Sequence, residues 1–240
     1  MTTLALDPEQ RSAPRLIAPI AHTIALVLLF LVMAAGGAML QQRAAAHSTT
    51  LPAPSRPTTL YLSLIAMEWG LVLYVARGGL RRTGTSLRAL VGGRWSGPRD
   101  VARDVVMAFA AWGIWTLFSW IANRAAGPEH AASVRSLLPR HPLDVALWIV
   151  LALSAGFSEE LVFRGYLFTQ FRALTRNTGI ALILQSALFG VAHGYQGVRA
   201  CASITLYGLF FGALALMNRS LRPSMIAHAW TDVAAGVFRI

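Results

Sequence analysis

The chain has 240 residues, of which 55% are hydrophobic and only 13% are charged, and its mean hydropathy is +0.54. A soluble domain carries about a quarter charged residues, so this composition excludes a soluble globular protein and indicates a polytopic membrane protein. The net charge of +11 comes from 21 arginines without any lysine, and these arginines are scattered among the connections between apolar segments. A nucleic-acid-binding protein would gather them on one soluble face, so we expect no nucleic acid partner. The single cysteine, Cys201, excludes an intrachain disulfide and a paired-cysteine metal site.

Seven apolar segments predict an all-α fold, a polytopic transmembrane helical bundle of about seven spans embedded in the lipid bilayer. These segments cover residues 16–40, 58–76, 105–122, 143–171, 178–194, 202–217 and 224–238. The prolines and polar residues between them predict loops at 41–57 and 123–142. The segment 143–171 is longer than the roughly 20 residues that a bilayer core requires. It therefore projects beyond the membrane, tilts strongly or bends near Gly156.

The connections divide the chain into three parts. Residues 1–15 predict a cytoplasmic tail, residues 16–142 an N-terminal transmembrane region of three spans, and residues 143–240 a transmembrane domain of four spans. The first region contains an arginine-rich loop at 77–103 with seven arginines. An inside amino terminus places 13 arginines in the cytoplasm and seven on the opposite side. We therefore predict a multi-pass protein of the plasma (inner) membrane with a cytoplasmic N-terminus.

Three ionisable residues interrupt the longest apolar segment, in the stretch Phe-Ser-Glu-Glu-Leu-Val-Phe-Arg at 157–164. Charges within a membrane are costly, so they face a bundle interior or a water-filled cavity and mark function. Glu160 and Arg164 are four residues apart and share a helical face, so they can neutralise each other. Glu159 lies about 100° around the helix from Glu160 and has no local partner. The pattern indicates either a general base or a buried structural ion pair with a spare acid.

Further ionisable residues lie in the apolar segments that follow. Phe189 and His193 are four apart and share a helical face, as do His228 and Asp232. An aspartate one turn from a histidine can fix the tautomer and the orientation of the imidazole. Lone histidines on apolar faces are usually structural, but two of them with glutamates and an aspartate favour catalysis. Glu68, at the middle of the second span, has no such companion at helical spacing; it can line the same cavity or pair with an arginine.

These residue types suit hydrolysis in either of two ways. A carboxylate and an imidazole can deprotonate one water while another imidazole stabilises the oxyanion. Alternatively, a divalent metal such as Zn²⁺, held by Glu159, His193 and His228, can activate the water. The helix-borne HExxH zinc signature is missing from the sequence, and so is a GxSxG nucleophile elbow. Serine hydrolysis is therefore not expected, and both water-activation mechanisms stay open.

The order of the three motifs resembles the CPBP family of intramembrane proteases. The motifs are Glu-Glu-x-x-x-Arg at 159–164, Phe-x-x-x-His at 189–193 and His-x-x-x-Asp at 228–232. The family includes type II CAAX prenyl endopeptidases and bacterial proteins tied to bacteriocin processing or self-immunity. The resemblance covers roughly residues 143–240, which it implies are a catalytic domain. It further implies a peptide or protein substrate at the membrane, prenylated in the CAAX case.

The resemblance also implies roles for the motif residues. Glu159 would activate water together with His193, while His228 and the residue at 232 would form the oxyanion site. Glu160, Arg164 and Phe189 would support this arrangement. The family's third motif often ends in Asn, whereas this chain has Asp232. An ionised Asp cannot donate to an oxyanion, so Asp232 must be protonated, orient His228 or help to bind a metal.

Simple alternation of spans creates a conflict in depth between the two motif histidines. His193 ends one span and His228 opens another that runs in the same direction, which separates them by roughly 14 Å. A shared site then requires tilted helices or irregular backbone, and we predict a break at 194–199.

Two other functions use similar residues. A non-catalytic immunity or scaffold protein could keep the fold, but it has no reason to keep costly intramembrane charges. A proton-coupled transporter would show two related halves with paired discontinuous helices, and the sequence has no such symmetry. The leading prediction is therefore an intramembrane endopeptidase. The sequence identifies neither the substrate nor the oligomeric state.

Overall fold

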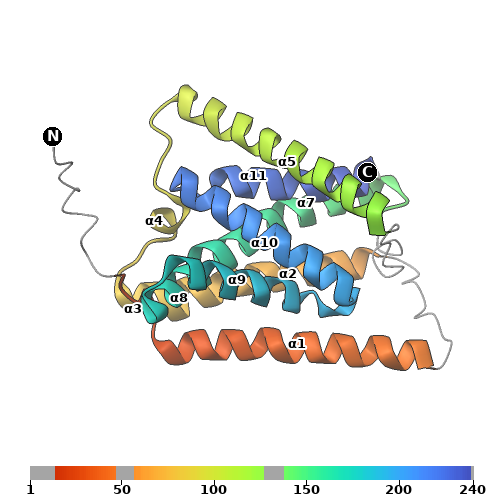
Figure 1. Cartoon of the computed structure of the whole chain (residues 1–240), viewed down its shortest axis with the longest axis horizontal. Helices are drawn as coiled ribbons and strands as arrows, with labels where there is room; N and C mark the ends of the chain where they lie inside the picture. Colours follow the sequence, from red (N-terminus) through yellow and green to blue (C-terminus); the bar gives the residue numbers. More distant parts are fainter. Residues whose placement is uncertain (1–13, 47–56, 127–137, 239–240) are drawn as a thin grey trace.

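The computed structural model describes residues 14–46, 57–126 and 138–238, and within these ranges it contains helices and their connections without strands. The longer helices are α1 (Ile20–Ala46), α2 (Thr58–Leu73), α5 (Pro98–Ala126), α7 (Pro142–Glu159), α9 (Thr178–Ala192), α10 (Val198–Asn218) and α11 (Arg222–Val237). Figure 1 shows them as one bundle, with α1 and α5 at opposite edges of the view. Helix α5 packs against α11, and α1 packs against α9. The predicted all-α bundle is confirmed.

Five helices in the described ranges are long and apolar enough to cross a membrane, and they make this a multi-pass membrane protein. They are Ile20–Leu40, Thr58–Thr83, Pro98–Ala125, Pro142–Thr175 and Val198–Asn218. The other two predicted spans are present as helices, but α9 has 15 residues and α11 has 16. Both are shorter than the roughly 20 residues that a bilayer core requires. Both lie inside the bundle, where neighbouring helices rather than lipid cover much of their surface.

Several helix boundaries differ from the sequence-based prediction. Helix α1 continues to Ala46 and α5 to Ala126, so the predicted loops at 41–57 and 123–142 begin later than expected. Alanine is the best helix former, and runs of it extend both helices beyond the apolar cores. Of the predicted tail at 1–15, only residues 14 and 15 lie within the described part of the chain.

The arginine-rich segment 77–103 is largely helical, although we predicted a loop. It contains the end of the π-helical segment η2 (Tyr74–Leu80), α3 (Arg81–Thr83), α4 (Leu87–Val91) and the start of α5. Helices α3 and α4 both end at a glycine in the left-handed conformation, Gly84 with φ 72° and Gly92 with φ 104°. Gly84 and Gly92 therefore terminate helices, whereas Gly78 and Gly79 lie within η2.

The longest span is continuous from Pro142 to Thr175, which confirms a segment longer than the bilayer requires. After α7 it continues through a π-helical segment, η3 (Glu160–Leu167), into α8 (Phe168–Thr175). Gly156, at which a bend was one of the alternatives, lies inside α7 and lets the backbone of α11 approach closely. The irregularity falls instead on η3, and π-helical turns are frequent at functional sites.

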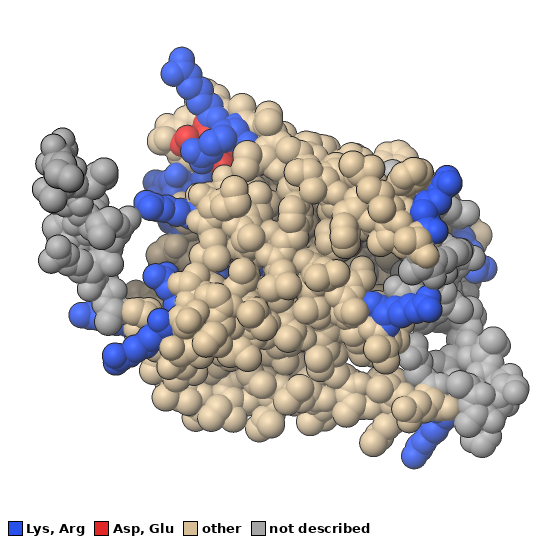
Figure 2. Space-filling view, viewed as in Figure 1, with Lys and Arg blue, Asp and Glu red and all other residues tan. Residues whose placement is uncertain are grey.

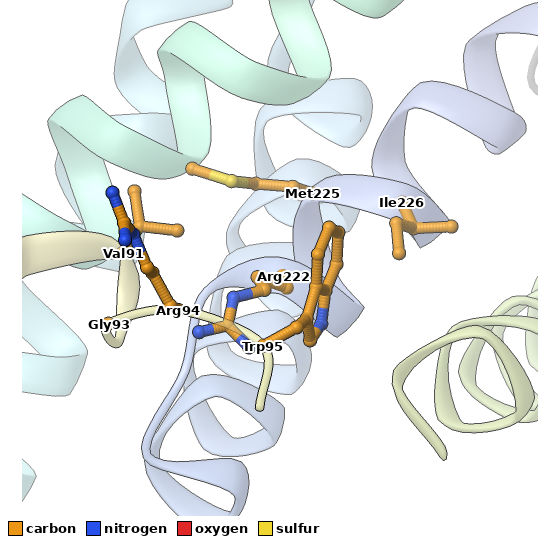
Figure 3. A pocket seen from close by; sticks show the side chains of 7 residues that line it. All are labelled: Val91, Gly93, Arg94, Trp95, Arg222, Met225 and Ile226. Atoms are coloured by element: carbon orange, nitrogen blue, oxygen red, sulfur yellow. The ribbon is translucent and has the colours of Figure 1, made fainter. Parts of the chain in front are cut away.

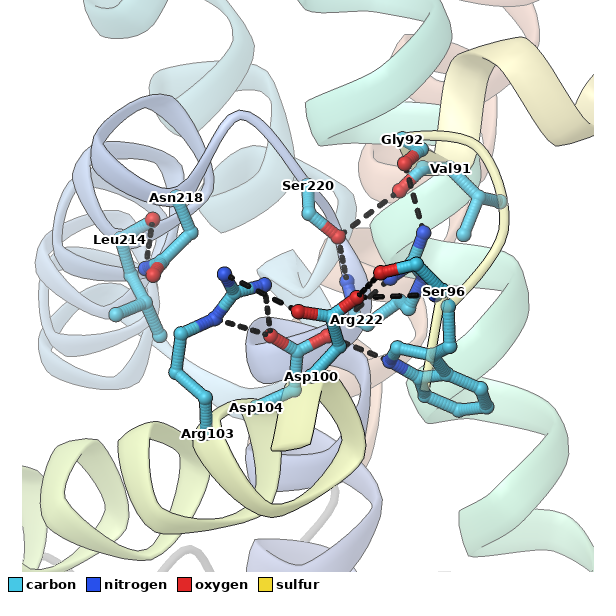
Figure 4. A network of polar contacts seen from close by, with 11 residues as sticks. Val91, Gly92, Ser96, Asp100, Arg103, Asp104, Leu214, Asn218, Ser220 and Arg222 are labelled. Atoms are coloured by element: carbon cyan, nitrogen blue, oxygen red, sulfur yellow. Dashed lines mark hydrogen bonds and ion pairs between the residues drawn. The ribbon is translucent and has the colours of Figure 1, made fainter. Parts of the chain in front are cut away.

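A polar network ties the N-terminal half of the chain to the first turn of α11 (Figure 4). Asp104 is fully buried and binds two arginines: its Oδ2 lies 3.4 Å from Arg222 Nη1, and its Oδ1 lies 3.0 Å from Arg103 Nη2. Trp95 Nε1 donates to the same carboxylate at 2.8 Å. Arg222 also donates to the carbonyl oxygen of Gly92 at 2.7 Å. The network therefore fixes the position along the bundle at which α11 begins.

A second polar cluster attaches α1 to η3 and α8. Tyr166 Oη lies 2.8 Å from His22 Nδ1 and 2.9 Å from Thr23 Oγ1. Gln170 donates to Thr23 and to the carbonyl oxygen of Ala18, and its Oε1 accepts from a backbone amide of the same segment. These contacts join residues about 150 positions apart in the sequence. The cluster fixes α1 against the rest of the bundle.

Candidate active site

Glu160 lies at the junction of α7 and η3 and is completely buried. The predicted pair with Arg164 is present, with Glu160 Oε1 3.4 Å from Arg164 Nη1. The same carboxylate oxygen also lies 2.9 Å from Nδ1 of His228, which comes from α11. A buried carboxylate bound to two cationic or donor groups loses less free energy on leaving water than an isolated one. Glu160 therefore connects the first motif to the third.

Glu159, which had no predicted local partner, meets its partner on another helix. Its Oε2 lies 3.6 Å from His228 Nε2, and the same nitrogen lies 3.7 Å from Oδ2 of Asp232. The Glu159 side chain is 16% exposed and that of Asp232 is 36% exposed, whereas Glu160 has no exposed surface. Nε2 of His228 therefore faces the open side of the cluster, between two carboxylates.

His193 lies at the C-terminal end of α9, where the regular helix stops. Its Nδ1 is 2.8 Å from the carbonyl oxygen of Phe189. A carbonyl oxygen only accepts hydrogen bonds, so Nδ1 is the donor and Nε2 of the neutral ring is free to accept a proton. The predicted break follows immediately, as a 3₁₀ turn at Gly194–Gln196 and then Gly197, whose positive φ of 98° favours glycine.

Phe189 joins the three motifs. Its ring is buried and lies 4.9 Å from the ring of His193 and 6.2 Å from that of His228, centroid to centroid. The guanidinium carbon of Arg164 sits 4.0 Å above the same ring, a cation–π contact. The two motif histidines are thus neighbours of one aromatic side chain. The depth conflict expected from straight vertical spans is therefore absent, and the backbone after His193 is irregular as predicted.

The predicted metal ligands do not form a metal site in this arrangement. Within the described ranges, no group of three or more His, Cys, Asp or Glu side chains could hold a metal ion. His228 Nδ1 is engaged by Glu160, and His193 Nδ1 by a backbone carbonyl. Only Glu159 and His228 of the predicted set are in contact with each other. As placed, these residues do not fit a metal ion held by three protein ligands.

Two residues near the cluster were not assigned by sequence reasoning. Tyr207 of α10 is buried, and its ring centroid lies 5.3 Å from that of His228. Trp148 of α7 donates from Nε1 to the backbone carbonyl oxygen of Asp232 at 2.7 Å. No helical spacing connects either residue to one of the three motifs, so no local sequence signal marks them as part of the site. Their proximity depends on contacts between α7, α10 and α11.

A pocket of about 480 Å³ lies apart from this cluster, between α4, the loop that follows it and the first turns of α11 (Figure 3). Its lining includes Trp95, Met225 and Ile226 together with two arginines, Arg94 and Arg222. None of the motif residues lines it. The pocket therefore belongs to the arginine-rich end of the bundle rather than to the motif cluster.

The described fold and site define a class: an all-α, multi-pass membrane protein with acid–histidine motifs brought together inside a helical bundle. In a comparison with family models, residues 141–234 are similar to the family described as type II CAAX prenyl endopeptidase Rce1-like. The matched segment contains every residue of the three motifs, which confirms the resemblance derived from them. At the level of the family, it supports a CAAX-type intramembrane protease. No curated protein and no solved structure matches the chain.

Proposed function

We propose that the protein is an intramembrane endopeptidase that hydrolyses a peptide bond of a membrane-associated protein or peptide, with a prenylated CAAX-type sequence as the candidate substrate. One observation carries the proposal: His228 of the third motif contacts both glutamates of the first, and Phe189 connects it to His193 of the second. A bundle that needed only packing would have no use for this convergence of charges, which are costly in a membrane.

Glu159 is the proposed general base. Its carboxylate lies on the exposed side of the cluster and has no arginine bound to it among the described residues. Nε2 of His193 is available as an acceptor, because Nδ1 donates to the helix. A water molecule between these two groups can give a proton to the carboxylate as it attacks the scissile carbonyl carbon. The proton then passes from Glu159 to the leaving amine, so the base is restored after each turnover.

His228 is the proposed oxyanion-stabilising residue. Its Nδ1 donates to the Glu160 carboxylate at 2.9 Å, which fixes the ring, so the ring acts as an imidazolium whose Nε2–H faces the open side and can donate to the oxyanion. Glu160 and Arg164 neutralise each other below it. Asp232 lies 3.7 Å from Nε2, beyond hydrogen-bond distance, so it orients the ring electrostatically rather than donating to the oxyanion. Stabilisation of the oxyanion by fixed groups is generally a large part of the catalysis of acyl transfer.

The proposed orientation places the arginine-rich end of the bundle in the cytoplasm of a plasma (inner) membrane. Figure 2 shows arginines at both ends of the molecule, with an apolar middle between them. The end that carries α3, α4 and the start of α5 has the seven arginines of the segment 77–103. Positive charge of this kind is retained on the cytoplasmic side. Helix α1 begins at the same end of the bundle, so a cytoplasmic N-terminus agrees with this orientation.

The test is cleavage of quenched fluorescent peptides, with and without a farnesyl group, by the protein in nanodiscs. Wild type, Glu159→Ala and His193→Ala are compared, each with and without a chelator. His141→Ala is the matched control, since His141 is an exposed histidine that precedes α7 and lies outside the motifs. We expect both site variants to lose at least about 100-fold in kcat, and the control to keep its activity. Cleavage that survives Glu159→Ala would contradict the mechanism, and the chelator arm tests for a divalent metal.

A further inference from the structure

Glu68 is a buried carboxyl group in a membrane helix and has no role in the mechanism described so far. It lies in α2 and is 5% exposed. Ionisable groups at such positions are costly and are kept where they have a partner and a function. Helix α2 precedes the segment 141–234 that matches the protease family. Any contribution of Glu68 to the site therefore comes from outside the matched domain.

The partner of Glu68 is the residue directly before the proposed base. Ser158 Oγ donates a hydrogen bond to Glu68 Oε2, although the two residues are 90 positions apart in the sequence. Ser158 is 1% exposed and belongs to the last turn of α7. The Glu68 carboxyl group also lies close enough to that of Glu159 for the two to interact.

The surrounding contacts hold Glu68 in register with α7. Trp69 donates from Nε1 to Ser154 Oγ at 3.2 Å, and its ring stacks on that of Phe157 at 5.8 Å between centroids. Ser154, Phe157 and Ser158 lie on the final turns of α7, just before Glu159. The α2 segment thus contacts α7 through two consecutive residues, Glu68 and Trp69. A carboxyl group placed in this way can restrict the orientation of its neighbours.

We infer that Glu68 is a positioning residue of the active site, which through Ser158 and its own contact with Glu159 holds the Glu159 carboxylate toward His228. Without it, Glu159 keeps its place in the chain but loses the contact opposite His228. Its Oε2, now 3.6 Å from His228 Nε2, is then free to rotate away. The kinetic part of this inference rests on the proposed function, whereas the geometric part does not.

The kinetic experiment compares Glu68→Ala, Glu68→Gln and Ser158→Ala with wild type in the peptide assay. Misplacement of a catalytic group by about 1 Å can cost up to roughly 100-fold in rate, so we expect Glu68→Ala to lower kcat by about 10- to 100-fold. KM should stay within about twofold, because no substrate contact is removed. Gln keeps an acceptor for Ser158 and offers an amide donor to Glu159, so Glu68→Gln should retain most of the activity.

A double variant tests whether the two residues act through the same contact. Ser158→Ala should lower kcat less than Glu68→Ala, and the double variant should be no worse than Glu68→Ala alone. The control is Ser63→Ala, since Ser63 also lies in α2 but donates only within its own helix, to the carbonyl oxygen of Thr59. Thermal unfolding of each variant shows whether it is folded. A folded Glu68→Ala protein with wild-type kcat would overturn the inference.

A structure of the Glu68→Ala protein decides the geometric part without any substrate. We expect the distance between Glu159 Oε2 and His228 Nε2 to increase beyond its present 3.6 Å. An unchanged distance would overturn the inference even if activity fell. If wild type cleaves neither peptide, the proposed function fails, and the structural comparison still decides whether Glu68 positions Glu159.

Discussion

Two buried polar clusters in this bundle contain histidine, and they differ in how completely their hydrogen bonds are satisfied. In the α1 cluster of Ala18, His22, Thr23, Tyr166 and Gln170, the contacts join neutral groups. Gln170 uses both ends of its amide, and the Tyr166 hydroxyl lies between His22 and Thr23. This cluster satisfies the polar groups that α1 buries and holds the helix in place.

The motif cluster is charged and is not fully satisfied. Among the described residues, Glu160 Oε2 and three guanidinium nitrogens of Arg164 have no hydrogen-bond partner. Arg164 nevertheless forms an ion pair with Glu160 and stacks on Phe189. Buried polar groups in folded proteins are almost always hydrogen-bonded, so exceptions require an explanation. The difference between the two clusters indicates that the first is retained for assembly and the second for chemistry.

Of the substitutions in the two clusters, Glu160→Ala should have the largest effect on stability and cleavage. The change removes the partner of a buried Arg164 and of His228 Nδ1. Breaking a buried ion pair by deleting one partner costs about 3–5 kcal/mol, so both stability and cleavage should fall. Thermal unfolding in nanodiscs measures the first and the peptide assay the second. A variant with wild-type stability would show that the cluster does not bury a true ion pair.

Gly156→Ala should separate α7 from α11. A Cβ at position 156 would lie 2.6 Å from the backbone nitrogen of Ala229, and a backbone atom cannot move aside as a flexible side chain can. Overpacking of this kind typically costs about 1–3 kcal/mol. Ala229 follows His228, so the contact between His228 and the glutamates should loosen and kcat should fall. Unchanged kcat would mean that the helices can separate without disturbing the motifs.

Gln170→Ala removes hydrogen bonds from the α1 cluster. It removes the hydrogen bonds to Thr23 and to the Ala18 carbonyl oxygen, and the acceptor for Ile17. Side-chain hydrogen bonds between membrane helices contribute on average about 0.6 kcal/mol each, so the loss of these three should lower stability by roughly 2 kcal/mol. Activity per folded molecule should be unchanged, as measured with the same peptide. A specific loss of kcat would contradict the division between assembly and chemistry.

The smallest effect on activity is expected from Asp232→Asn. This change introduces the Asn that often ends the third motif in the CPBP family. Asp232 is partly exposed and 3.7 Å from His228 Nε2, so its charge contributes only about 0–1 kcal/mol. The amide has the same shape and adds a donor, so kcat/KM should change by less than about fivefold. A loss of more than 100-fold would show that the carboxylate itself takes part in the reaction.

Local spacing predicted much of the site. Glu160 with Arg164, Phe189 with His193, and His228 with Asp232 are each four residues apart, and helical geometry alone brings each pair together. The break after His193 was also predictable, because straight spans would have left the histidines at different depths. These predictions succeeded because they required only helical geometry and the thickness of a membrane.

Other features depend on contacts between distant segments and were not predictable in the same way. The partner of Glu159 comes from α11, and that of Glu68 comes from α7. No rule of spacing connects residues 90 positions apart. The helical content of the segment 77–103 was not predicted, because glycines are also common in loops. Only the positive φ angles of Gly84 and Gly92 identify these two glycines as helix ends.

The distance in sequence between Glu68 and Ser158 has a consequence for biosynthesis. The two residues are 90 positions apart, which at about 5–20 residues per second is on the order of 5–20 s of translation. During that interval α2 has been synthesised, while the serine that hydrogen-bonds its carboxyl group has not. Until α7 emerges, α2 therefore carries an acid without this partner, which makes its insertion into the membrane more costly.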